Sequence, residues 1–281
     1  MYTAKTWPIA CAMLPFGGKD STGRPLQDAD PGEWAKHLSL VRKLGFTEVD
    51  PTDTWVRVGD LSDDRLKDFQ RVLDDNGLTV PAISTSRRSV MDAEHGAEYL
   101  EYSHRLLDKA AAIGVPMVSF GFFQPFTPAQ SEVLWFWLAD GHQDDPARRD
   151  EAVQRIRELA EHAAGNGQQI TLEMYEDTYI GTADDAVQFV KEVDHPAVGL
   201  NPDIPNFVRL HRPMENIQSM WDKLLPHTNY WHVKNYLRDE DPASGVVTTF
   251  PTSMEAGIID YRSAITQAVQ GGYTGAFLCE H

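Results

Sequence analysis

Cysteine is scarce in this 281-residue sequence, and no long apolar stretch runs without interruption. Cys11 and Cys279 cannot supply a disulfide framework and form no CxxC motif, so we expect a reduced, cytoplasmic setting. The longest apolar region, residues 110–126, is broken by glycines and prolines, which predicts a helix end and a buried strand rather than a membrane span. The short apolar segment 9–14 lacks a basic leader, so we expect no targeting signal.

Positive charge is also scarce, because 25 lysines and arginines stand against 42 acidic residues, for a net charge of −17. Such a surface repels the phosphates of nucleic acids and of anionic lipids, so we expect neither nucleic acid nor a membrane as a partner. The hydrophobic fraction is 42%, and a chain of this length suits one α/β barrel or two smaller domains.

A glycine-rich dinucleotide motif is missing, and no sequence motif recurs. Pro15-Phe16-Gly17-Gly18 is not the GxGxxG turn that an open, doubly wound sheet would need. What recurs is a strand followed by a helix. Strands are predicted at 9–14, 46–49, 78–84, 115–120, 169–175, 197–201, 229–234 and 275–280, and helices at 31–44, 63–76, 94–113, 146–164, 182–193, 214–224 and 260–270. This alternation predicts an α/β fold, a (β/α)₈ TIM barrel in one domain spanning residues 1–281.

Two features of this barrel need comment. The sequence stops at His281, directly after the last predicted strand, so the last helix is missing from it, and we expect further residues or another chain to cover that face. Two connections, 121–145 and 236–257, are long and follow strands four and seven, which places both at the active-site end. The first of them is rich in aromatic residues: Phe122, Phe123, Phe126, Trp135, Phe136 and Trp137.

Metal-type side chains occur at the ends of the last four predicted strands. Glu173 shares a strand face with Tyr175, and His232 shares one with Lys234, while the apolar residues between them face the helices. Glu280 ends the last strand, and Asp203 follows the sixth. Three carboxylates converging in a barrel mouth repel one another unless a cation neutralises them. Three oxygen ligands and one imidazole suit Mn²⁺, Mg²⁺ or Co²⁺ better than a structural zinc site.

The spacing supports this interpretation, since Glu173, Asp203 and His232 are separated by about 30 residues each, the length of one strand–helix unit. Any one of these residues alone could be an ordinary capping or salt-bridged residue. Four of them at four successive strand ends favour one divalent metal ion held by Glu173, Asp203, His232 and Glu280. Lys234 could polarise a substrate oxygen or balance the carboxylates, and we favour the balancing role.

Several segments of the C-terminal 110 residues resemble the xylose-isomerase-like sugar isomerase/epimerase superfamily. They are Thr171-Leu172-Glu173, Gly199-Leu200-Asn201-Pro202-Asp203, His232-Val233-Lys234-Asn235, Gly257-Ile258-Ile259-Asp260-Tyr261 and Gly272-Tyr273-Thr274-Gly275. The resemblance implies the same four metal ligands, with Mn²⁺ as the expected ion and Mg²⁺, Co²⁺ or Zn²⁺ as alternatives. It also implies substrate contacts for Arg238, six residues after His232, and for Asn206, which stands where the family commonly has a histidine.

A narrower resemblance links the chain to the catalytic (α) subunit of bacterial C-glycoside deglycosidases, which work with a small β subunit. It lies in Met174-Tyr175-Glu176-Asp177-Thr178, Arg209-Leu210-His211-Arg212-Pro213 and Asn229-Tyr230-Trp231-His232-Val233-Lys234-Asn235-Tyr236. These enzymes cleave the carbon–carbon bond between a 3-oxo sugar and an aromatic aglycone. The aromatic connection 121–145 fits such a substrate, although an apolar subunit interface would explain it equally well.

The implied chemistry is removal of a proton beside a carbonyl, through an enediolate stabilised by the metal. Glu173 and Glu280 would serve as base and acid, and Tyr175 would contact substrate. His142, in the aromatic connection, is a further candidate base, with a solvated loop histidine as the alternative. We expect a small sugar or aryl C-glycoside substrate and an oligomer. Ketose 3-epimerase, sugar isomerase or inosose dehydratase activity is the alternative, and a DNA-repair nuclease or a non-catalytic scaffold subunit is more remote.

Overall fold

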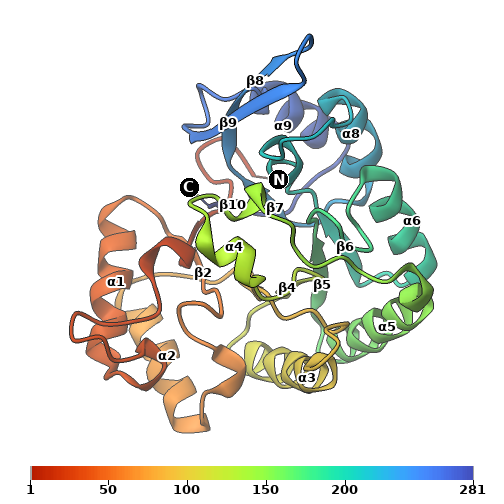
Figure 1. Cartoon of the computed structure of the whole chain (residues 1–281). Helices are drawn as coiled ribbons and strands as arrows, with labels where there is room; N and C mark the ends of the chain where they lie inside the picture. Colours follow the sequence, from red (N-terminus) through yellow and green to blue (C-terminus); the bar gives the residue numbers. More distant parts are fainter. Residues whose placement is uncertain (1, 281) are drawn as a thin grey trace.

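The computed structural model describes residues 2–280, so the terminal His281 lies outside the described residues. Strands and helices alternate as the sequence predicts, and the helices surround the strands (Figure 1). The strands are β1 (Ile9–Ala12), β2 (Glu48–Asp50), β3 (Ile83–Ser84), β4 (Met117–Gly121), β5 (Gln169–Glu173), β6 (Val198–Asn201), β7 (Trp231–Val233), β8 (Asn235–Asp241), β9 (Val246–Thr252) and β10 (Phe277–Cys279). The helices are α1 (Pro31–Lys43), α2 (Asp63–Asp75), α3 (Gly96–Ala112), α4 (Pro128–Glu132), α5 (Arg149–Gly165), α6 (Ala183–Val193), α7 (Pro205–Val208), α8 (Ile217–Leu224) and α9 (Tyr261–Gln270).

Eight of the strands form a closed parallel barrel. Two four-stranded sheets, ordered β2-β1-β10-β7 and β3-β4-β5-β6, make up most of its wall. Single parallel bridges join the sheets on both sides, Glu48 to Thr79 and Thr52 to Ser84 on one side and Leu200 to Thr228 on the other. The predicted (β/α)₈ TIM barrel is therefore confirmed, and its strand ends meet at one rim, as the strand-end argument requires.

The barrel has an inner and an outer packing layer. Inside it, Ala10, Ala12, Ala82 and Ala276 pack around Tyr230 and Leu278. The outer layer between strands and helices holds the larger apolar side chains, among them Leu172, Met174, Trp231 and Val233. This alternation along β5 and β7 turns Glu173, His232 and Lys234 inward, because side chains in a strand point to opposite faces in turn.

Two of the segments that differ from the sequence prediction lie in the second half of the chain. Residues 236–257, expected to be a loop, instead contain the antiparallel hairpin β8–β9, paired from Asn235 with Thr252 to Asp241 with Val246. The β-branched run that begins at Val246 is the sequence signal for this strand. The helix expected at 214–224 begins only at Ile217, because Asn216 caps it by accepting hydrogen bonds from two backbone amides.

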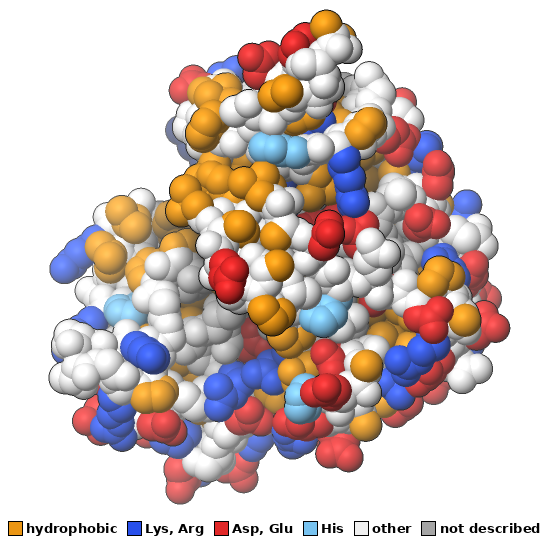
Figure 2. All heavy atoms as spheres, in the orientation of Figure 1, with side chains coloured by type: hydrophobic (Ala, Val, Ile, Leu, Met, Phe, Trp, Pro, Cys, Tyr) orange, Lys and Arg blue, Asp and Glu red, His pale blue; other side chains and the backbone are white. Residues whose placement is uncertain are grey.

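The connection that follows β4 lies across the barrel at the end where the strands finish, and it contains α4 (Figure 1). Its end is attached to the connection after β5, since the Tyr179 amide donates to Asp144 Oδ2 at 2.9 Å and the Tyr179 hydroxyl donates to Asp145 O at 2.9 Å. Figure 2 views the same face and shows apolar side chains between the hairpin and the centre.

None of the described helices is long and apolar enough to cross a membrane.

Candidate metal centre

Glu173, Asp203, His232 and Glu280 converge inside the barrel, where each offers a ligand atom within 4.8 Å of all the others. His232 Nδ1 lies 3.4 Å from Glu173 Oε1 and 3.9 Å from both Asp203 Oδ2 and Glu280 Oε2. All four residues are buried, and Asp203 has no exposed surface. The barrel topology produces this convergence, since β5, β6, β7 and β10 follow one another around the wall and end at the same rim.

The ring of His232 is oriented by a hydrogen-bonded chain from the opposite side of the barrel. Ser84 Oγ donates to Asp50 Oδ2 at 2.8 Å, so it is left to accept a hydrogen bond from His232 Nε2, 3.4 Å away. Tyr230 also donates to Asp50, at 2.7 Å. With its proton held on Nε2, neutral His232 presents the Nδ1 lone pair to the carboxylates, which is how outer partners orient a metal-binding histidine.

Two atoms of the group are buried without a hydrogen bond, His232 Nδ1 and Asp203 Oδ1. Buried polar atoms are nearly always hydrogen-bonded, so two such atoms in one group are what a site that takes a cation would show. Lys234 contributes a positive charge to the group. Its Nζ donates to Asp203 Oδ2 at 2.5 Å and to Glu280 Oε2. One ammonium against three carboxylates leaves two negative charges, which one divalent cation would neutralise.

The pKa values show how strongly these groups depend on one another. Burial raises the pKa of Asp203, while the ammonium of Lys234 opposes this shift. Burial lowers the pKa of His232, but the carboxylates, with Glu173 foremost, outweigh it and raise the pKa to about 9. A proton therefore occupies the imidazole when the group holds no cation, and a divalent cation would take the place of that proton.

The donor set fits one divalent cation. It offers three carboxylates and one imidazole whose second nitrogen is hydrogen-bonded, without thiolate ligands. Oxygen-rich sites of this kind suit Mn²⁺ or Mg²⁺. Such a group can hold a cation and place two carboxylates beside whatever ligand the cation binds.

Aromatic side chains cover the group from the rim. Tyr175 stacks on Phe123 with ring centroids 4.2 Å apart, and Phe136 and Trp137 lie beside them. Arg209 lies over this aromatic surface, 4.7 Å from the centre of the Phe136 ring. The cavity that reaches Glu173 has a volume of about 20 Å³, so a sugar can enter only if the cover moves.

The structure brings Lys234 and Tyr175 to the four-ligand group but leaves His142 and Arg238 away from it. His142 is exposed and lines a different cavity of about 230 Å³, bounded by Glu176 and His211 among others. Arg238 donates to the backbone carbonyls of Val208 and Arg212, each at 2.8 Å, and so fixes the segment between α7 and α8. Arg238 makes these backbone contacts because it lies on β8, a strand of the hairpin that the sequence did not predict.

Asn206 has an intermediate position. It is fully buried, and its side-chain amide donates to Met174 O at 2.9 Å. Its Oδ1 is buried without a partner. The side chain thus fixes the end of β5 and retains one free acceptor.

Sequence reasoning missed the residues that support the ligands from the first half of the barrel, Asp50 and Ser84. Asp50 is the last residue of β2, and Ser84 is the last residue of β3. A polar residue at a strand end was the signal that identified the four ligands.

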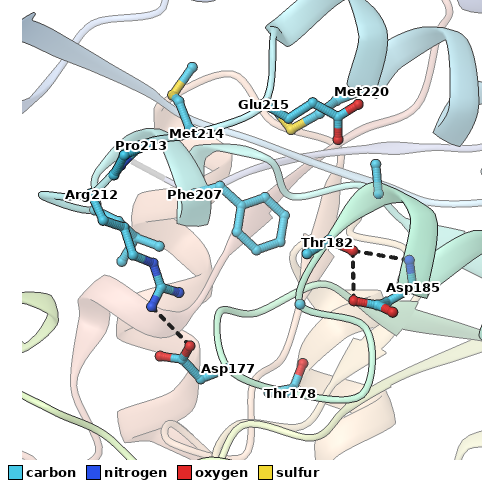
Figure 3. Close-up of a pocket in the computed structure, with 13 residues that line it drawn as sticks. Asp177, Thr178, Thr182, Asp185, Phe207, Arg212, Pro213, Met214, Glu215 and Met220 are labelled. Atoms are coloured by element: carbon cyan, nitrogen blue, oxygen red, sulfur yellow. Dashed lines mark hydrogen bonds and ion pairs between the residues drawn. The ribbon is translucent and has the colours of Figure 1, made fainter.

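A separate cavity of about 410 Å³ lies between the start of α6 and the segment before α8, with Phe207 on its wall and the Arg212–Asp177 ion pair at one end (Figure 3). None of the four metal-type residues lines it.

Comparison with known proteins agrees with this geometry. A xylose isomerase-like TIM barrel protein from Mycobacterium smegmatis, crystallised in complex with magnesium, is 53% identical, with a TM-score of 0.97 over 100% of this chain and 92% of that one. The D-psicose 3-epimerase of Clostridium cellulolyticum H10, solved with D-tagatose, shares the fold at 17% identity, with a TM-score of 0.67 over 97% of this chain and 84% of that one. The 3-keto-D-glucoside 4-epimerase of E. coli does so at 14% identity, with a TM-score of 0.65 over 98% and 92%.

A search of curated proteins found no match. The family model described as xylose isomerase-like TIM barrel matches residues 38–281, which is most of the chain. The chain therefore belongs to the xylose isomerase-like TIM barrel family.

Proposed function

We propose that this protein is a divalent-metal-dependent sugar enzyme that removes a proton beside a carbonyl, and specifically that it cleaves 3-oxo-C-glycosides as the catalytic subunit of a C-glycoside deglycosidase. The observation that carries the first part is the buried group of three carboxylates and one imidazole, in which His232 Nδ1 and Asp203 Oδ1 make no hydrogen bond. The magnesium in the 53% identical relative supports a divalent cation. We keep Mn²⁺ as the expected native ion.

A cation bound here would polarise the carbonyl oxygen of a sugar ketone and so acidify the neighbouring C–H bond. Of the four ligands, Glu173 alone lines the cavity that opens toward the aromatic cover, and it makes no ion pair with Lys234. We therefore assign Glu173 as the base that takes the proton. We assign Glu280, whose Oε2 accepts a hydrogen bond from Lys234, as the acid that returns a proton.

Carbon–carbon cleavage follows from this proton transfer when the carbon next to the reacting C–H carries an aryl group. The electron pair of the broken C–H bond forms a double bond conjugated with the ketone, and the pair of the carbon–aryl bond leaves with the aryl carbon, which is then protonated. No oxidant is consumed. The aromatic side chains around Tyr175 and Phe123 supply the apolar surface that a flat aglycone needs.

Ketose 3-epimerase activity is the second candidate, because the same four ligands support it and a D-psicose 3-epimerase shares the fold. Epimerisation requires no aromatic surface, so the aromatic side chains that cover the barrel favour the deglycosidase.

An apolar surface on the same face, including Leu134 (85% exposed), Leu237 and Phe250, supports our proposal of a subunit contact, either with a second copy or with a small β subunit. The scarcity of cysteine, with Cys11 and Cys279 alone in the sequence, supports the proposed cytoplasmic location.

The test is metal content and turnover of the purified chain, beside His232→Ala and the matched variant His162→Ala on the outer helices. We expect about one divalent ion in the wild type and in His162→Ala and none in His232→Ala, with Mn²⁺-dependent aglycone release from a 3-oxo-C-glycoside following the same order. Turnover is measured with and without a candidate β subunit. Epimerisation of a ketose without aglycone release would support the second candidate, and a wild type that binds no ion would overturn both.

A further inference from the structure

We propose that Arg87 forms a binding site for an anionic oxygen on a planar aromatic group, so that the substrate is an aryl compound carrying a phenolate or a carboxylate. The inference rests on the proposed function and deepens it, since it specifies the aglycone. It starts from one contrast: within residues 2–280, every other arginine makes a hydrogen bond or an ion pair, and Arg87 makes neither.

Arg87 is half-buried, and one of its unused donors is shielded from water. Its Nε is buried without a partner, and its guanidinium stacks on Phe126, 3.9 Å from the ring centre, with Phe123 at 6.0 Å. Burial lowers the pKa of this side chain, which shows that its charge is partly removed from solvent. A desolvated guanidinium with free edges is the form in which arginine binds planar oxyanions.

The backbone holds this side chain in place. Arg87 has a φ of 57°, in the left-handed region that residues with side chains rarely adopt. Its two neighbours are both tied to the buried Asp53, since the Ser86 amide donates to Oδ1 at 2.8 Å and Arg88 Nε donates to Oδ2 at 2.5 Å. A strained residue between two anchored neighbours indicates a side chain whose direction matters to function.

That direction is toward the metal centre. Arg87, Glu173, Tyr175 and Phe123 line the same small cavity. A second arginine, Arg209, lies on the aromatic cover, but the carboxylate of Glu176 accepts its hydrogen bonds at 3.2 and 3.3 Å and cancels its charge. Arg88 also lines the cavity, but its charge is neutralised by Asp53, whose Oδ2 accepts from Arg88 Nε at 2.5 Å. Of the arginines that line this cavity, Arg87 is therefore the one without an anionic partner, and it faces the place where an aryl group would lie beside the sugar.

An anionic oxygen bound to Arg87 would assist the proposed cleavage of the carbon–aryl bond. When the carbon–aryl bond breaks, its electron pair is left on the aryl ring, and a ring oxygen held by a guanidinium stabilises that charge. Arg87 would then both select the aglycone and assist its departure.

The test uses probes that need no turnover, 4-nitrophenol and benzoate. Absorbance distinguishes the phenolate of 4-nitrophenol from the phenol, so a titration reports which form is bound. We expect the wild type to favour the phenolate and Arg87→Met to lose at least about tenfold in affinity for both anions, with Arg87→Lys in between. Arg212→Met is the matched control, because Arg212 carries an exposed guanidinium at the same end of the barrel and is already paired with Asp177 at 2.9 Å.

Thermal melting shows that each variant is folded, and metal content is measured on the same samples. Equal affinity in wild type and Arg87→Met, absence of probe binding to the wild type, or an equal loss in Arg212→Met overturns the proposal. A wild type that favours both anions yet holds no metal ion would support the anion site while contradicting the proposed function.

Discussion

Two clusters of histidine and carboxylate lie in different parts of this molecule. One is the group of Glu173, Asp203, His232 and Glu280 inside the barrel. The other lies on the outside, where α3 and α5 face one another: His104 Nε2 is 2.8 Å from Glu158 Oε1, His162 Nε2 is 2.7 Å from Asp108 Oδ1, and the two Nδ1 atoms are 2.7 Å apart.

The residue types are similar, but their hydrogen bonding differs. In the outer cluster every ring nitrogen has a partner, and each carboxylate is more than half exposed, so water and neighbouring side chains satisfy the group. In the inner cluster His232 Nδ1 and Asp203 Oδ1 are buried without a hydrogen bond. Residue composition alone therefore does not distinguish a candidate metal centre, whereas buried ligand atoms that converge without hydrogen bonds do.

The sharpest way to test this contrast is to change one carboxylate in each cluster. Asp203→Asn keeps the shape of the side chain but removes a charged ligand, so we expect loss of the bound ion and a fall in kcat/KM beyond the 10- to about 100-fold that follows loss of an outer hydrogen-bond partner. Asp108→Asn should leave both quantities unchanged. Metal analysis and kinetics on the two purified variants check this, and equal ion content in Asp203→Asn and wild type would contradict it.

A smaller effect is expected from Ser84, which touches the metal centre only through His232. Ser84→Ala removes the acceptor that fixes the Nε2 proton and leaves Asp50 without one of its donors. We expect cation affinity to fall by about 10- to 100-fold with the ligands intact. Calorimetric titration with Mn²⁺ measures this, with Ser103→Ala on α3 as a serine control. An unchanged affinity would show that the Asp50–Ser84 chain does not orient the ring.

The four inner residues could be predicted from sequence because barrel topology alone brings strand ends together. Glu173, His232 and Glu280 needed only the period of two along a strand and the assumption of closure. The same rule applied to the first half of the chain would have found Asp50 and Ser84, which end β2 and β3.

Side chains on the connections could not be predicted in this way. Arg238 was expected to contact substrate, but it lies on a strand of the unpredicted hairpin and bonds to backbone carbonyls of another connection. The position of Arg87 depends on a left-handed backbone conformation and on two hydrogen bonds to Asp53, none of which has a periodic pattern. Such positions are set by tertiary contacts, which a single sequence does not display.

The smallest effect should come from the outer cluster itself. His162→Ala removes a hydrogen bond to Asp108 and one to His104, but both lie at a surface where exposed pairs contribute little, so we expect a loss of about 1 kcal/mol or less in the free energy of unfolding. Ion content and turnover should match those of the wild type, since the four ligands converge inside the barrel, whereas His162 lies on the outer helix α5 and bonds to Asp108 and His104. Denaturant unfolding and metal analysis check both statements. If His162→Ala lost the ion, the outer histidines would bind metal, and unpaired buried atoms would no longer separate the two clusters.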